Sequence, residues 1–398
     1  MRDDNALGRR IRELRRIRHL SLDAAAGLAG MSRSMLSYIE RGERALERRS
    51  HVQGLAYALR ISPDELLGQP YPLTGDDRAS AQAHIEGIRS ALMVTGIGHV
   101  EDANPVERPV GELVANAGRA RTALCRDADY SAAAAGLADI LVGLHVHTAG
   151  PAGRDQERAL RALVLACCTA CAIAKELGYS DLAWVAAERA RHAAQAIDDP
   201  VLDGLASTYV CYALQTHVTK LSLSLRAIGR IEPHVGSDPL AMQVYGQLQL
   251  RAAHDSAVTG RPAADYLAEA YRVGERTGER TDYGIYFGPT NIGIWDTAIA
   301  IEQGEGGRAA RIAEQVNITA MPSRQRQAMF YADLGRALAQ DRQHAQALDA
   351  FLTAERLAPV FVHSSPFARD AVLDIRDRAR RASVGRELSA LVYRMGLI

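Results

Sequence analysis

The sequence is poor in aromatic residues and in long apolar runs. Aromatic residues make up only 5% of the 398 residues, although hydrophobic residues make up 47%. Alternating runs of β-branched residues are scarce, whereas Ala and Leu are abundant, so helices are expected in place of strands. The most apolar stretch, ALVLACCTACAIA at 162–174, has 13 residues, whereas a membrane span needs roughly 20. We therefore expect an all-α protein that has no membrane partner.

A signal peptide and a zinc-finger pattern are also missing. The N-terminal MRDDNALGRR is charged and has no apolar segment of the kind that a signal peptide carries. We expect a cytoplasmic protein whose five cysteines are reduced. Cys167, Cys168 and Cys171 lie downstream of His145 and His147, but no second ligand pair follows at zinc-finger spacing. The three cysteines are therefore predicted to be core residues, and no metal or cofactor is expected.

The sequence shows no recognisable enzyme motif and contains only two lysines. No glycine-rich phosphate loop, nucleophile elbow or paired-carboxylate motif stands out, so we expect no enzyme activity. Lys175 and Lys220 are the only lysines, and arginine supplies the other basic side chains. The formal net charge is zero, but residues 1–68 contain 13 arginines and nine acidic residues, a net charge of +4. This basic segment predicts an anionic partner for the N-terminal part alone.

Capping signals divide residues 7–68 into five predicted short helices. Apolar residues recur there at three- and four-residue steps, as on the buried face of a helix. Ser21 and Ser32 stand at N-cap positions, and Gly30 and Gly42 follow the helices that these serines begin. The sequence therefore predicts a compact helical domain over residues 1–70.

The third of these helices is too short to be stable without tertiary packing. We expect Leu28, Leu36 and Ile39 to share a core with Leu55. The face that is left over presents polar side chains, and these are Arg33, Ser34, Ser37 and Tyr38.

The stretch AGMSRSMLSYIERG at 29–42 resembles the helix-turn-helix of the Cro/C1 repressor family. In that family the second helix of the motif enters the major groove of DNA, and dimers read inverted repeats. The resemblance implies base-reading roles for four residues, which are Arg33, Ser34, Ser37 and Tyr38. It implies phosphate contacts for four others, which are Arg10, Ser32, Arg41 and Arg44. The alternative interpretation is a helical protein-interaction domain that does not bind DNA.

One position departs from the family pattern. Leu22 stands where the family often has Gln, so one expected polar contact with DNA is missing. The residue that replaces this contact is not apparent from the sequence. An arginine at the position of Arg33, at the start of the helix, can contact the O6 and N7 atoms of guanine.

The rest of the chain is predicted to be a connecting segment followed by helical hairpins. Residues 71–109 are expected to form a linker and a connecting helix, because proline and glycine are frequent at 69–78 and 96–112. Beyond residue 110, several breaks that contain Pro or Gly are 37 to 39 residues apart. That spacing indicates helical-hairpin repeats.

One hairpin, at 331–359, resembles a tetratricopeptide repeat. Gly335 and Ala347 are small, as required where two antiparallel helices approach closely, and Phe351 fills the gap between hairpins. The resemblance implies that residues 110–398 form a tetratricopeptide-like superhelix with a concave groove. We expect this domain to serve as a sensor and as the dimerisation surface of a homodimer.

The two-part design resembles the peptide-sensing RRNPP regulators of quorum sensing and actinobacterial regulators of the same design. The resemblance implies that a short peptide in the groove changes operator affinity. The uncharged, aromatic-rich YGIYFGPTNIGIW at 283–295 is the best ligand-binding segment, since an Asn amide both donates and accepts hydrogen bonds. The predicted ligand-binding residues are Asn291, Tyr286, Phe287 and Trp295, with Tyr245 and Gln249 as weaker candidates. The alternatives are core positions for these residues, a small-molecule sensor, and a scaffold controlled by a partner protein.

Overall fold

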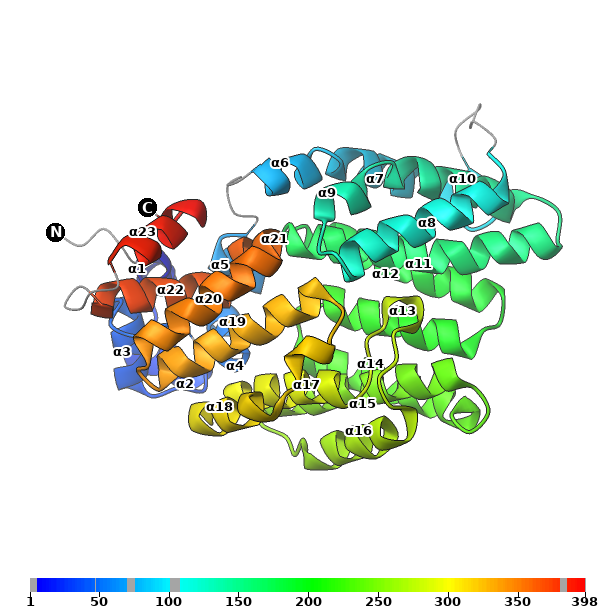
Figure 1. The fold of residues 1–398 in the computed structure, drawn as a ribbon. Coiled ribbons are helices and arrows are strands. Elements are labelled where there is room, and N and C mark those ends of the chain that lie inside the picture. Colours follow the sequence, from blue (N-terminus) through cyan, green and yellow to red (C-terminus); the bar gives the residue numbers. More distant parts are fainter. Residues whose placement is uncertain (1–5, 47, 70–75, 101–107, 380–384, 398) are drawn as a thin grey trace.

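The computed structural model describes residues 6–46, 48–69, 76–100, 108–379 and 385–397. Within these ranges the chain is all-α, as predicted, apart from one two-stranded hairpin (Figure 1). The N-terminal domain consists of α1 (Ala6–Ile17), α2 (Leu22–Leu28), α3 (Arg33–Glu40), α4 (Arg49–Leu59) and α5 (Pro63–Leu67).

The predicted caps of the N-terminal helices are confirmed. The Ser21 side chain accepts a hydrogen bond from the Ala24 backbone N–H, and Ser32 accepts one from Met35. Gly30 has a φ of 68°, the left-handed conformation that ends α2 at low steric cost. The turn between α2 and α3 therefore follows directly from the local sequence.

The core of this domain is close to the predicted one, with one error. Leu36, Ile39 and Leu55 are buried, but Leu28 is 51% exposed. A Cβ on Gly54 would lie 2.4 Å from the Ala29 carbonyl oxygen, so α4 meets the end of α2 backbone to backbone. The prediction for Leu28 was wrong because this close contact uses the small residues of α2 and turns Leu28 outward.

The remaining elements form a helical body. They are α6 (Asp76–Gln82), α7 (Ile85–Val94), β1 (Thr95–Gly96), β2 (His99–Val100), α8 (Val110–Cys125), α9 (Tyr130–Ala134), α10 (Leu137–Ala149), α11 (Arg154–Glu176), α12 (Ser180–Ala196), α13 (Pro200–Ala213), α14 (His217–Ile231), η1 (Glu232–His234), α15 (Pro239–Val258), α16 (Ala264–Thr277), η2 (Asp282–Gly284), α17 (Pro289–Gln303), α18 (Gly306–Gln315), η3 (Ile318–Ala320), α19 (Arg324–Gln340), α20 (His344–Leu357), α21 (Pro359–Ser364), α22 (Pro366–Ala379) and α23 (Gly385–Arg394). From α10 to α16, and again from α17 to α20, each helix packs against the next along the chain. The strands β1 and β2 pair antiparallel, with Thr95 opposite Val100.

The helices α19 and α20 form the hairpin that the 331–359 segment predicts. A Cβ on Gly335 would lie 3.0 Å from the Phe351 ring, so the two helices meet where Gly335 leaves room. Phe351 and Ala347 are fully buried. The main core of the body begins before residue 110, because Ile85 and Ile88 of α7 belong to it.

The segment Tyr130–Ala149 is long and apolar enough to cross a membrane by length and composition. It consists of α9 and α10, which are separated by Gly136 with a φ of 70°. Half of it is buried inside the protein, and core helices of soluble proteins pass the same test, so it is weak support for a membrane span. The predicted core cysteines Cys167, Cys168 and Cys171 are fully buried on α11 as free thiols.

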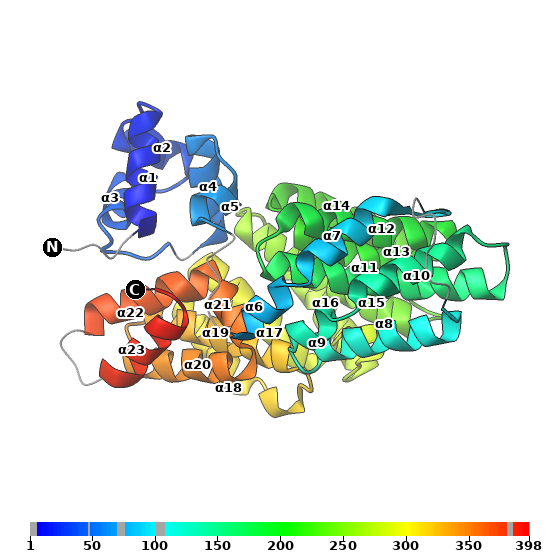
Figure 2. The ribbon, with the colours of Figure 1, turned by 90° about the horizontal axis from the view of Figure 1, so that it is seen from above.

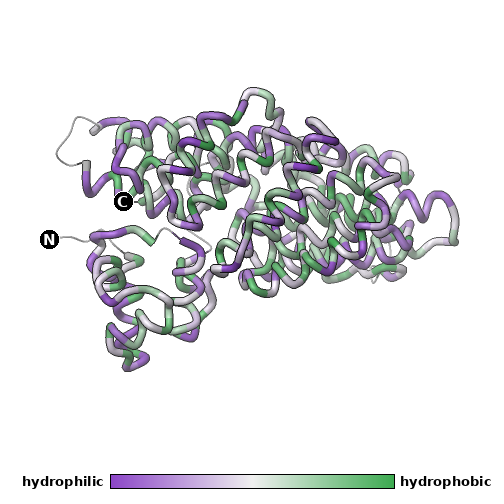
Figure 3. The backbone as a smooth tube through the Cα atoms, turned by 90° about the horizontal axis from the view of Figure 1, so that it is seen from below, coloured by the Kyte–Doolittle hydropathy of each residue, from purple (hydrophilic) through white to green (hydrophobic). Residues whose placement is uncertain are grey.

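The N-terminal domain lies beside the body, with α4 and α5 on the side that faces it (Figure 2). The Cα trace coloured by hydropathy shows apolar and hydrophilic stretches alternating along the helices, as expected for helices with one buried face (Figure 3). The chain thus forms two helical units that pack against each other.

Candidate DNA interface and interdomain cavity

The helix α3 presents three of the predicted base-reading residues to solvent. Arg33, Ser34 and Tyr38 are exposed on this helix. The Arg33 guanidinium lies 3.6 Å from an oxygen of Asp23, and both side chains are 68% exposed. An ion pair this open to water is weak, so Arg33 remains accessible for DNA.

The fourth predicted reader, Ser37, is engaged with Arg41. Arg41 donates a hydrogen bond to the Ser37 hydroxyl, and donates to the Glu43 carboxylate at 2.7 and 2.9 Å. Its guanidinium also lies 5.0 Å from the centre of the Tyr38 ring. The hydrogen bonds with Glu43 raise the pKa of Arg41. Arg41 is nevertheless 45% exposed, so this surface ion pair is weak and leaves Arg41 accessible for DNA.

The other predicted phosphate-contacting residues lie at the surface. Arg10 on α1 and Arg44 after α3 are both exposed. The Ser32 hydroxyl caps α3 and lies 3.1 Å from the Ser34 hydroxyl. The structure thus places Ser32 beside the exposed N-terminus of α3, where a phosphate oxygen could also accept from it.

An ion pair that the sequence did not reveal fixes α3 on α1. Arg15 donates to both Glu40 carboxylate oxygens, at 2.6 and 2.8 Å, and to the Leu20 carbonyl oxygen at 2.9 Å. Glu40 is only 7% exposed. These hydrogen bonds raise the pKa of Arg15. The only sequence signal was an acidic residue within an otherwise buried face of α3.

Glu302 on α17 anchors the N-terminal domain to the body. Its carboxylate accepts hydrogen bonds from the backbone N–H of Arg49, at 2.9 Å, and from the Arg49 guanidinium. Arg336 of α19 donates to the same carboxylate at 3.3 Å. Burial opposes ionisation of Glu302, but Arg49 and Arg336 lower its pKa to about 2. Both guanidiniums also lie 4.8 Å from the ring centre of Phe367 on α22.

Further hydrogen bonds join the domains. The Gln215 side chain, in the turn between α13 and α14, donates to Asp64 at 2.7 Å, while the Gln53 side chain donates to the Gln215 carbonyl oxygen. In the loop after α3, the Leu46 backbone N–H donates to Asp370 of α22. The helix α22 therefore touches the loop that follows the recognition helix.

A cavity of about 380 Å³ lies between the two domains. Its lining includes Arg49 and Gln53 of α4 and Asp64 of α5, together with residues of α11, α13, α14, α15, α17 and α19. Small-molecule sites have volumes of roughly 300–1,000 Å³. A ligand of that size in this cavity would touch the DNA-binding domain and the helical body at once.

Two of the six predicted ligand-binding residues, Tyr286 and Trp295, line this cavity. Asn291 is fully buried and does not line it, but donates at 3.2 Å to Gln247, which does. Phe287 is fully buried, and its ring occupies the space that a side chain on Gly246 would need.

The two weaker candidates, Tyr245 and Gln249, lie on α15 and do not line the cavity. The Tyr245 hydroxyl donates to Glu269 of α16 at 3.3 Å, and Gln249 is buried. The structure therefore brings only Tyr286 and Trp295 together at the cavity.

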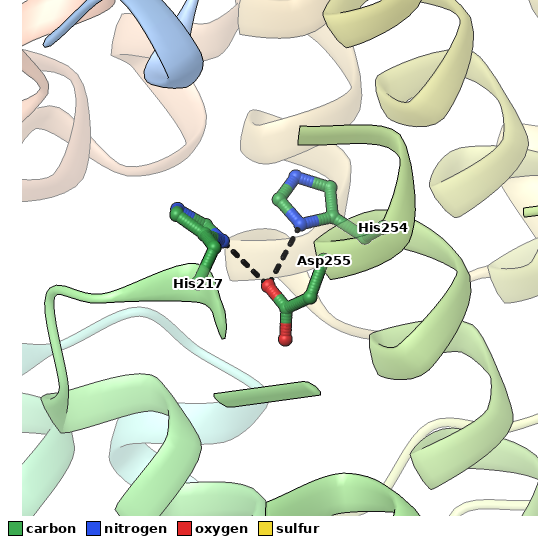
Figure 4. A group of neighbouring side chains, drawn as sticks. All are labelled: His217, His254 and Asp255. Atoms are coloured by element: carbon green, nitrogen blue, oxygen red, sulfur yellow. Dashed lines mark hydrogen bonds and ion pairs between the residues drawn. The ribbon is translucent and has the colours of Figure 1, made fainter. Parts of the chain in front are cut away.

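Two histidines and an aspartate form a buried cluster in the cavity wall. His217 of α14 and His254 of α15 both point toward Asp255 (Figure 4), with Nδ1 to Oδ1 distances of 2.6 and 3.5 Å. Burial lowers the pKa of His217 to about 3. Burial opposes ionisation of Asp255, but hydrogen bonds from His217 and His254 lower its pKa. The ligand atoms of the three residues lie within 4.8 Å of one another, as a metal site requires, and hydrogen bonds join them in this structure.

Comparison with protein families matches residues 6–67 to the model of a helix-turn-helix domain. The match spans α1 to α5, and the N-terminal domain is a helix-turn-helix domain of the Cro/C1 type. Comparison with curated proteins found no match to the chain.

Proposed function

We propose that this DNA-binding transcription regulator changes its operator affinity when a ligand occupies the cavity between its two domains. The observation that carries the proposal is the composition of the cavity wall, which includes residues of α4 and α5 as well as of the body. A ligand shifts a conformational equilibrium only by the difference between its affinities for the two states. A ligand that touches both domains binds two arrangements of the domains with different affinities, because its contacts change when the domains move.

The cavity volume favours a small molecule or a very short peptide over a long one. A volume of about 380 Å³ is at the lower end of the range for small-molecule sites. The peptide that the RRNPP resemblance implies is therefore restricted in size, and quorum sensing by such a peptide remains part of the proposal. A small-molecule sensor of the same architecture is the second candidate, and the small volume of the cavity favours it.

The same proposal assigns roles to the segments of the chain. Residues 1–70 bind DNA, residues 71–109 connect, and residues 110–398 form a tetratricopeptide-like domain that senses and dimerises. A single helix-turn-helix buries too little surface for high specificity, so the working form is a homodimer on an inverted repeat. Its place of action is the cytoplasm. No enzyme activity and no cofactor enter the proposal.

Selection of genomic DNA fragments by the full-length protein tests this function. The selection is run with and without a small-molecule fraction of a culture extract. We expect one inverted-repeat sequence to be enriched, and its yield to change with the extract. An interaction scaffold controlled by a partner protein would enrich no sequence under either condition.

A further inference from the structure

Four cationic side chains line the cavity without a carboxylate partner. They are Lys220, Arg251, Arg326 and Lys175, of which Lys175 donates to the Ser180 hydroxyl at 3.0 Å. In the part of the chain that the structure describes, none of them forms an ion pair, and the Arg251 Nε is buried with no hydrogen-bond partner. Charges inside proteins are normally paired, because an unpaired buried charge is costly.

Arg251 and Arg326 meet at one aromatic side chain. Each guanidinium carbon lies 5.6 Å from the centre of the Trp295 ring. The indole Nε1 of Trp295 is itself buried and has no hydrogen-bond partner. Stacking on the ring partly compensates the two charges, but it leaves these N–H donors unused. Two buried donors without a hydrogen-bond partner, Arg251 Nε and Trp295 Nε1, are therefore close to each other.

Among the described residues, no acidic side chain of the cavity wall forms an ion pair with these cations, although the charge of Asp255 favours the charged form of Lys220. Each acidic side chain of the wall is bonded to some other side chain. These acids are Asp64, Glu176, Asp255 and Asp333. The cavity lining also contains more arginine and lysine side chains than aspartate and glutamate side chains.

Both lysines of the chain line this cavity, although arginine supplies every other basic side chain. Burial lowers the pKa of Lys220 to about 7. The negative charge of Asp255 raises this pKa, whereas the positive charges of Lys175 and Arg251 lower it further. Burial and then the charge of Arg251 lower the pKa of Arg326 to about 10. The cavity thus disfavours the charged forms of Lys220 and Arg326, and a bound anion would favour them.

We propose that the cavity ligand is anionic, and that Arg251, Arg326 and Lys220 bind its carboxylate or phosphate group beside Trp295. The planar fork of an arginine side chain matches both kinds of oxyanion. The terminal carboxylate of a short peptide and the acidic group of a small metabolite share this chemistry. The inference rests on the proposed function in taking the cavity as the ligand site, and it adds the chemical class of the ligand.

Fluorescence of Trp295 in the full-length protein tests the inference. The chain has two tryptophans, so Trp184→Phe on the half-exposed surface of α12 leaves Trp295 as the only one. The probes are benzoate, phenyl phosphate and the uncharged benzyl alcohol. Trialanine and its C-terminal amide distinguish a peptide carboxylate from other acids. We expect benzoate, phenyl phosphate and trialanine to change the fluorescence and raise the Tm. Benzyl alcohol and the trialanine amide, which have no anionic group, should do neither.

Arginine variants separate a binding role from a structural one. Arg251→Met and Arg326→Met should each weaken binding of the anionic probes about tenfold or more, the effect of losing a hydrogen bond between charged groups. In the absence of a probe they should raise the Tm, because an unpaired charge is removed. Arg311→Met, at an exposed position on α18, is the matched control and should change neither quantity.

The inference is overturned if benzyl alcohol binds as tightly as benzoate, or if no anionic probe binds at millimolar concentration. It is equally overturned if Arg326→Met lowers the Tm and leaves probe affinity unchanged. No DNA is present in these measurements, so their outcome is independent of the proposed function. An anion that binds without changing operator affinity would leave the anion site in place and refute the proposed function.

Discussion

Arg33 occupies the first position of the recognition helix and is exposed, with only a loose ion pair to Asp23. We predict that Arg33→Ala relaxes preference at one base pair and costs about 1–3 kcal/mol on the preferred operator. Arg44→Ala should instead weaken binding to all duplexes to a similar extent and flatten the salt dependence. Titrations of matched and scrambled duplexes at several salt concentrations measure both effects. Equal weakening of every duplex by Arg33→Ala would remove this residue from base reading.

We predict that Lys220 makes the proposed anion binding dependent on pH. Its pKa in the free protein is lowered to about 7, so it loses its charge as the pH rises through 7. Since only charged Lys220 attracts an anion, we predict that benzoate affinity is highest below pH 7 and falls between pH 7 and 9. His217 stays neutral over this range, because its pKa is about 3. The charged groups that act on Lys220 from the packed elements are Asp255, Lys175, Arg251 and Arg49.

The control for this pH profile is Lys220→Met. This variant should bind benzoate more weakly at pH 6 and show a flat profile from pH 6 to 9. If the wild-type profile is flat, or if the variant keeps the slope, then Lys220 does not bind the anion.

The proposed ligand site could be predicted only in part from single residues. An uncharged aromatic segment is as typical of a buried core as of a ligand-binding surface. In the structure Phe287 belongs to the core, whereas Trp295 lies in the cavity wall. Arg251 and Arg326 belong to different helices, α15 and α19, so their meeting at Trp295 depends on the tertiary fold. The rarity of lysine was the one sequence signal for this cluster, but it does not indicate where in the fold the two lysines lie.

At the scale of elements, the contact between α4 and α17 depends on Glu302. We predict that Glu302→Gln lowers stability by about 3 kcal/mol, the low end for breaking a buried ion pair, because Arg49 is partly exposed. It should also shrink the effect of the ligand on operator affinity, because α4 is then less firmly linked to the body. Thermal melting and operator titration of the same variant measure the two effects.

Glu305→Gln is the control for this variant, since Glu305 lies near Glu302 in an exposed ion pair with Arg308. It should change stability by less than about 1 kcal/mol. The pKa of Glu302 is lowered from 4.5 to about 2. Its contribution is therefore complete above pH 4.5 and is lost as the pH falls toward 2. A variant that melts like the wild type at neutral pH would contradict the assigned role of Glu302.

Element boundaries in the N-terminal domain could be predicted because local chemistry determines them. The Ser21 and Ser32 caps and the turn glycine Gly30 depend on neighbours in the sequence alone. The two-stranded hairpin at residues 95–100 was expected to be irregular, since strands of two residues carry no alternating pattern. The packing of α22 against the loop after α3 joins residues over 300 positions apart, and no local signal indicates it.

At the scale of the whole molecule, we predict a homodimer that binds an inverted repeat. Two recognition helices on one operator account for specificity that a single domain cannot supply. Sedimentation of the full-length protein at micromolar concentration should show a dimer. Affinity for a duplex with two half-sites should exceed that for one half-site by far more than twofold. A monomer that binds both duplexes equally would refute the prediction.

The most direct test of the account is operator affinity measured with the cavity occupied and empty. The ligand is the fraction of a culture extract that changes Trp295 fluorescence, and the operator is the sequence that genomic selection enriches. The account predicts a change in operator affinity of about 5- to 150-fold, the usual range of allosteric coupling, and an equal change in ligand affinity when operator is added. A ligand that saturates Trp295 fluorescence and leaves operator affinity unchanged would contradict the account.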